Sequence, residues 1–149
     1  MGVDKRTGTM LFTHHGGPAA PAVALDYMRG YHAIDPRAQL LMSLPYGAWV
    51  HCHEHFDERY VSTHPFYQEF LLPHGGRYVS GRKVFEDDET VMVLGLHRPA
   101  ARGPFRSEEH PMLYRLGEHV EHAMRIYRRL RDHSPSLIGR GPRSGGAGA

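Results

Sequence analysis

The segment His51-Cys52-His53-Glu54-His55 concentrates the residue types that bind transition metals. In a strand, His51, His53 and His55 would point to one face, because alternate side chains of a strand point the same way. Imidazoles at that spacing can share a Zn²⁺ ion. The chain carries 13 histidines scattered along its length, so a solvated strand face is the competing interpretation. We favour that interpretation, predict no metal or other cofactor, and keep a His-cluster metal-binding protein as an alternative.

The chain contains no other pattern with an obvious catalytic mechanism. It has no ordered Ser/His/Asp set, no paired carboxylates, no Gly-rich phosphate loop and no HExxH motif. We therefore predict no catalytic residues and a protein that is not an enzyme. The single cysteine, Cys52, excludes an internal disulfide bond and is expected to be a small buried residue.

Length, composition and charge favour one globular domain that does not bind DNA by itself. The chain has 149 residues, 40% of them hydrophobic and 23% charged. Residues 1–124 hold 12 basic and 15 acidic residues, a net charge of −3, which makes a poor partner for nucleic acid. No apolar run has the length of a membrane span and no signal peptide is evident, so we expect a cytoplasmic protein without a membrane partner.

The pattern of apolar residues and breakers predicts helices mixed with antiparallel strands. Asp35 is expected to end a first helix and to cap a second one, with Pro36 at its first position. The acidic turn between Phe85 and Thr90 indicates a hairpin, whose second strand is apolar on both faces and therefore central in its sheet. The expected elements are a strand at 9–13, helices at 20–33 and from 36, a strand at 47–53, a helix from 63–65 to 73, strands at 78–85 and 90–98, and a helix at 107–131.

This order predicts an α+β fold in which an antiparallel sheet is flanked by helices and followed by a long C-terminal helix. We expect one PAS/GAF-like sensor domain over residues 1–133. Residues 134–149 are rich in Gly, Pro and Ser, and we expect them to form a disordered tail.

Five segments resemble the sensor module of LuxR-type bacterial transcription regulators, in order and over residues 27–131. They are YHAIDPR at 31–37 (Y-x-x-x-D-P), LPYG at 44–47 (L-P-x-G), HPFYQEFLLPHG at 64–75 (S-E-F-Y-x-D-F-L-x-P-x-G), LGLHR at 94–98 (L-x-L-x-R) and GPFRSEE at 103–109 (G-P-F-x-x-E-E). The resemblance implies a PAS/GAF-like ligand sensor, which in these regulators precedes a helix-turn-helix. Nothing after Arg131 is expected to form a helix-turn-helix, so we expect no direct DNA binding by this chain.

The resemblance also implies a ligand site. Acyl-homoserine-lactone receptors of the same superfamily are similar in holding their ligand with aromatics, an Asp-Pro aspartate and a tryptophan. The alternative is that the tyrosines belong to the core and Asp35 is only a helix cap. Pro45 stands one residue further from Trp49 than the pattern expects, and such a slip would turn the indole to the other face of a strand. The candidate ligand-binding residues are Tyr27, Tyr31, Asp35, Trp49, Tyr67 and Phe70.

The last predicted helix carries apolar residues in a heptad rhythm, which favours a homodimer. The proposed contact residues are Leu116, Val120, Ala123, Tyr127 and Leu130. The function we predict is a small-molecule-sensing and dimerisation module that acts in bacterial transcription regulation, with an unidentified ligand. The alternative is a ligand-free truncated regulator that acts by heterodimerisation with full-length relatives.

Overall fold

The computed structural model describes residues 1–14 and 21–133, and the predicted tail lies outside the described residues. Its centre is one antiparallel sheet with the strand order β2-β1-β5-β4-β3. The strands are β1 (Gly2–Asp4), β2 (Met10–Phe12), β3 (Trp49–His51), β4 (Gly76–Glu86) and β5 (Thr90–Pro99). The β4–β5 hairpin and the central place of β5 were predicted from the sequence, and both predictions are confirmed.

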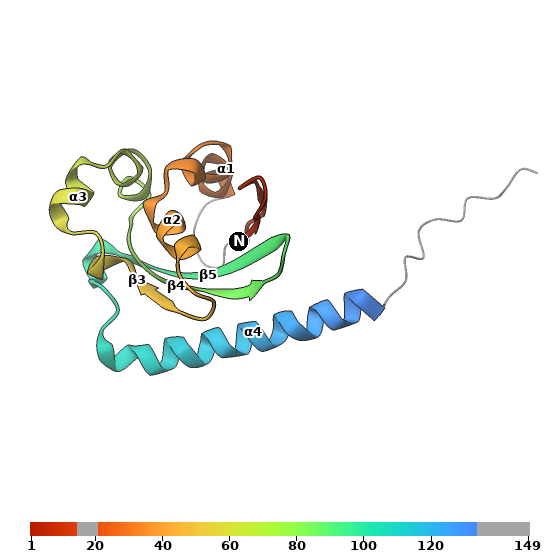
Figure 1. The fold of residues 1–149 in the computed structure, drawn as a ribbon. Helices are drawn as coiled ribbons and strands as arrows, with labels where there is room; N and C mark the ends of the chain where they lie inside the picture. The colour runs from red at the N-terminus through yellow and green to blue at the C-terminus, as the bar shows by residue number, and fades with distance from the viewer. Residues whose placement is uncertain (15–20, 134–149) are drawn as a thin grey trace, which may run out of the picture.

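Helices cover the two faces of the sheet. One face carries α1 (Pro21–Arg29), α2 (Pro36–Ser43), α3 (Glu58–Thr63) and a π-helix at Phe66–Leu71, while α4 (His110–His133) runs along the other face (Figure 1). The predicted α+β class, with an antiparallel sheet flanked by helices and a long C-terminal helix, is confirmed.

Two apolar clusters fill the side of the sheet that faces α1 to α3. Leu41 of α2 packs on Val50, Val91 and Val93 of the sheet. A second cluster lies within the helical layer itself. Its buried members are Val61, Phe66, Tyr67, Phe70 and Leu71. The helical layer is therefore held by aromatic packing as well as by contact with the sheet.

Close contact joins α4 to the opposite face. A Cβ atom at Gly117 would lie 2.8 Å from both Trp49 Cζ2 and Arg82 Cδ, so only glycine lets the helix approach this closely. Arg82 Nη2 then donates to Glu121 Oε2 at 2.6 Å, and both side chains are largely buried. Leu113 is 2% exposed and completes the interface.

The N-terminal end of α4 is anchored to the end of β5. Both Nη atoms of Arg98 donate to the carboxylate of Glu109, which also accepts from the backbone N–H of Arg106 at 2.8 Å. These hydrogen bonds lower the pKa of Glu109 to about 2. The Arg98 guanidinium also lies 4.2 Å from the centre of the Phe105 ring. The motifs at 94–98 and 103–109 therefore meet in one contact, which fixes the start of α4 to the end of β5.

Three expected elements differ from those observed. The helix expected at 20–33 ends at Arg29, because Gly30 adopts φ −156°, and a 3₁₀ turn follows at Tyr31–Ile34. The strand expected at 47–53 spans Trp49–His51 only. Val79 N–H, which a longer β3 would have paired, donates to Cys52 Sγ at 3.0 Å instead. The helix expected from 63–65 is a π-helix, and it follows the short helix α3, which was not predicted.

Candidate ligand-binding site

Asp35 begins the candidate site as the N-cap of α2. Its Oδ1 atom accepts from the backbone N–H of Arg37 at 2.9 Å and from that of Ala38 at 3.4 Å, and Pro36 occupies the first turn. The predicted cap is therefore confirmed. Asp35 is only 2% exposed, however, which is unusual for a residue that does no more than cap a helix.

The same carboxylate holds two further side chains. Arg37 donates from Nε to Oδ1 at 2.9 Å and from Nη2 to Oδ2 at 2.8 Å, and Tyr27 Oη donates to Oδ2 at 3.0 Å. Burial alone would raise the pKa of Asp35, but the charge and hydrogen bonds of Arg37 outweigh it and lower that pKa. Burial and the nearby carboxylate raise the pKa of Tyr27, so its hydroxyl stays protonated and remains a donor.

Aromatic rings enclose this ion pair. The Arg37 guanidinium lies 4.6 Å from the centre of the Phe66 ring, and Tyr27 lies 5.7 Å from Phe70 between ring centres. Tyr31 stacks on Phe70 at 4.6 Å. We call the set Tyr27, Tyr31, Asp35, Arg37, Phe66 and Phe70 the Asp35 cluster. It combines packed aromatic side chains with a few oriented polar groups, which are the residue types that line small-molecule sites.

Three buried donors at the cluster and beside it have no hydrogen-bond partner: Arg37 Nη1, Arg77 Nη1 and Tyr67 Oη. Leaving such a group unpaired costs about 1–3 kcal/mol, more when it is charged. Arg77 lies on β4 and is 4% exposed. Sequence reasoning missed both arginines. Arg37 had a signal, because it follows Asp35-Pro36 directly, whereas Arg77 had none.

Trp49 lies apart from the other five predicted ligand-binding residues. Its ring is 5.2 Å from Tyr114 and 6.3 Å from His51 between ring centres, and it packs against Gly117 of α4. Val50, the next residue, packs into the helical side of the sheet. Of the predicted residues, Tyr27, Tyr31, Asp35 and Phe70 form one contact network. Tyr67 adjoins it through Phe66, at 5.6 Å between ring centres.

His51 also lies on the α4 face. Its ring stacks on that of His110 at 4.0 Å between ring centres, with an angle of 4° between the planes. Its Nδ1 atom lies 2.8 Å from Ser80 Oγ and its Nε2 atom 3.4 Å from Tyr114 Oη. His53 follows in a 3₁₀ turn, so the histidines of this segment do not line one strand face. Among residues 1–14 and 21–133, no three histidine, cysteine or acidic side chains are arranged to hold a metal ion.

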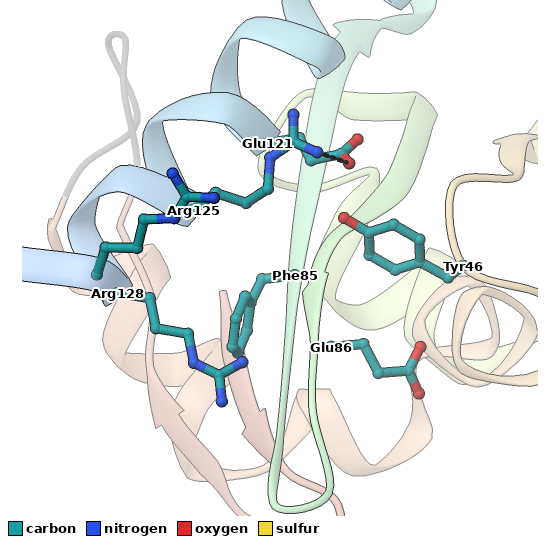
Figure 2. A pocket seen from close by; sticks show the side chains of 7 residues that line it. Tyr46, Phe85, Glu86, Glu121, Arg125 and Arg128 are labelled. Atoms are coloured by element: carbon teal, nitrogen blue, oxygen red, sulfur yellow. Dashed lines mark ion pairs between the residues drawn. The ribbon is translucent and has the colours of Figure 1, made fainter. Parts of the chain in front are cut away.

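A hollow of about 500 Å³ opens between the C-terminal half of α4 and the β4–β5 hairpin (Figure 2). Tyr46 points toward Glu121 there, and Arg128 lies 5.1 Å from the centre of the Phe85 ring. Its charged groups already pair, since Arg125 meets Glu121 at 3.6 Å and Arg128 meets Asp87 at 3.7 Å. We therefore assign no ligand to this hollow.

The predicted dimer residues lie along α4 away from its buried side. Leu116, Tyr127 and Leu130 are 42%, 56% and 65% exposed, Ala123 is also exposed, and Val120 is half-buried. We call these five residues the α4 stripe. Figure 1 shows that the C-terminal turns of α4 continue beyond the sheet.

The chain matches no protein-family model, no curated protein and no solved structure. None of the helices in the described part of the chain is long and apolar enough to span a membrane.

Asp35→Ala should destabilise the fold far more than loss of a helix cap explains. The substitution leaves the Arg37 charge buried without its partner, which costs about 3–5 kcal/mol. Asp57→Ala is the matched control, because Asp57 caps α3 in the same way but is exposed, and it should cost only about 1 kcal/mol. Urea unfolding followed by circular dichroism measures both. Equal losses for the two variants would show that the ion pair contributes nothing beyond the cap.

Acidification should loosen the α4 interface through His51. Burial and then the neighbouring His110 lower the pKa of His51 below its ordinary value of 6.5. Below that pH the unfolded chain binds more protons than the native one, so stability falls as the pH drops toward the lowered native pKa. The free energy of unfolding should therefore fall between about pH 7.5 and 5.5, and His51→Gln should reduce that loss. The exposed His122→Gln serves as the control, and a loss unchanged in His51→Gln would refute the assignment.

Proposed function

We propose that the chain is a small-molecule-sensing and dimerisation module related to the sensors of LuxR-type bacterial transcription regulators. It is a binding module and not an enzyme, and it works in the cytoplasm. The observation that carries the proposal is the Asp35 cluster, a buried ion pair with a tyrosine hydroxyl inside an aromatic enclosure. Structural packing alone does not need an ion pair there, since well-packed apolar residues of similar volume are often at least as stable.

The ligand would lie between the helical layer and the sheet. Tyr27 and Asp35 come from α1 and the start of α2, and Phe66 and Phe70 come from the π-helix, so a molecule held by them contacts several elements at once. Irregular helices of this kind recur at functional sites. Ligand binding would order these elements against the sheet and so stabilise the native state.

A second candidate function rests on a different observation. The α4 stripe remains exposed even if the helical layer holds no ligand, and it could pair with the same helix of a relative. The chain would then act by heterodimerisation with full-length regulators. Bound ligand separates the two candidates, because only the sensing function requires it.

The protein purified from its producing cell should carry a small molecule. Native mass spectrometry should show the folded chain with an added mass that disappears on denaturation. Asp35→Asn keeps the size of the side chain but removes the charge, and it should carry less of the added mass. Tyr60→Phe, at an exposed ring, is the control. A wild type without added mass, stabilised by no compound of a metabolite library, would favour the ligand-free candidate.

The α4 stripe should form a concentration-dependent homodimer. Two copies can bury their stripes by two-fold symmetry, and salt should strengthen the pairing by screening the basic residues near Tyr127 and Leu130. Analytical ultracentrifugation at low and high salt should therefore detect a dimer in the wild type and a monomer in Tyr127→Glu/Leu130→Glu.

Arg115→Gln/His122→Glu makes the same change in charge at two exposed positions of α4 outside the stripe, so this control should still dimerise. A monomeric wild type at every concentration, or a dimer that both double variants form equally, would contradict the proposal.

A further inference from the structure

We infer that the ligand of this site is an acid, whose carboxylate or phosphate oxygens accept hydrogen bonds from Arg37 Nη1, Arg77 Nη1 and Tyr67 Oη. We call these three groups the donor triad. The inference rests on the proposed function, because it names the chemical class of the molecule that the Asp35 cluster would hold.

The donor triad lacks hydrogen-bond acceptors within the protein. Arg37, Arg77 and Tyr67 are 6%, 4% and 0% exposed, so solvent does not supply the missing partners. A guanidinium group only donates hydrogen bonds. The Tyr67 hydroxyl also stays a donor, since burial raises its pKa. The group that completes the site must therefore offer several acceptors.

The members of the triad come from three elements but lie in one neighbourhood. Arg37 belongs to α2, Tyr67 to the π-helix and Arg77 to β4. The Arg77 guanidinium lies 5.6 Å from the centre of the Tyr67 ring. The Arg37 guanidinium lies 4.6 Å from the centre of the Phe66 ring, and the centre of that ring lies 5.6 Å from the centre of the Tyr67 ring.

The two arginines of the triad differ in how well their charges are compensated. Asp35 compensates Arg37 inside the protein, since both side chains are nearly inaccessible. The carboxylate that pairs with Arg77 belongs to Glu58, which is 82% exposed, so water weakens that pair. The Cys52 thiol supplies no negative charge, because burial raises its pKa. Arg77 is therefore the less firmly compensated of the two arginines, and its unpaired Nη1 atom favours an anionic partner.

A neutral occupant fits these facts less well. A single water molecule accepts two hydrogen bonds at most, so it would leave part of the triad without an acceptor. A carboxylate or phosphate offers at least four lone-pair directions together with a negative charge, which strengthens each hydrogen bond that it accepts. The Phe66 and Phe70 rings next to the triad would suit an apolar remainder of such an acid.

The test compares acids with neutral molecules of the same shape. The melting temperature of the full chain is measured against rising sodium benzoate, sodium acetate and sodium phosphate at constant ionic strength, with benzamide and acetamide as neutral counterparts. At least one of the oxyanions should raise the melting temperature saturably, and the amides should not.

Three variants connect the response to the triad. Tyr67→Phe and Arg77→Met should each weaken binding of the stabilising anion by about tenfold or more, the effect of losing one hydrogen bond to a charged group. Without anion, Tyr67→Phe should melt no lower than the wild type, because it removes an unsatisfied hydroxyl, and this shows that the variant folds. Tyr60→Phe is the matched control at an exposed ring and should bind like the wild type.

Equal stabilisation by the acids and the amides, no saturable response to any of the three oxyanions, or anion binding unchanged in both triad variants would each overturn the inference. Native mass spectrometry keeps this failure separate from failure of the proposed function. If the purified chain retains a molecule without an acidic group, the sensing function stands and the acid specificity falls. If it retains nothing and responds to no acid or amide, both fall.

Discussion

One buried carboxylate connects most of the helical layer. Asp35 caps the N-terminus of α2 by accepting hydrogen bonds from its free backbone N–H groups. Its carboxylate also binds the Arg37 guanidinium and accepts a hydrogen bond from the Tyr27 hydroxyl of α1. Arg37 in turn lies over Phe66 of the π-helix. Helices α1 and α2 thus share a single acceptor group, and Arg37 connects it to the π-helix, so each contact restricts where the other two elements can lie. The order of the aromatic residues around it follows from this constraint, as does the burial of a charge that would otherwise remain in water.

The family-like motifs have a physical meaning that does not depend on any relative. Arg98 and Glu109 lie in two different motifs, yet they form the ion pair that starts α4 beside the end of β5. In the same way the aspartate-proline motif and the aromatic motif at 64–75 meet where Arg37 lies over Phe66. Motif residues that are far apart in the sequence therefore form two contacts that hold elements of the fold together, although the chain matches no family model.

Much of this arrangement could be predicted because it depends on local chemistry. Asp35-Pro36 specifies a helix start and the acidic turn specifies a hairpin, and neither needs tertiary information. The first strand, β1, was missed because Gly2–Asp4 is too short to show alternation and is placed by pairing with β5. The face on which Trp49 lies depends on a one-residue register, which a spacing argument could only leave open. Arg77 joined the candidate site through the bulged register of β4 on β5, a property of the sheet that no local pattern encodes.

The position of Trp49 has an optical consequence. It is the only tryptophan of the chain, and it lies between the sheet and α4, beside Tyr114, His51 and the close approach at Gly117. Indole emission responds to the polarity and to the aromatic neighbours of the ring. The intrinsic fluorescence of this protein is therefore a reporter of a single joint. It records whether α4 is seated on the sheet, and it does so from the side of the sheet opposite to the Asp35 cluster.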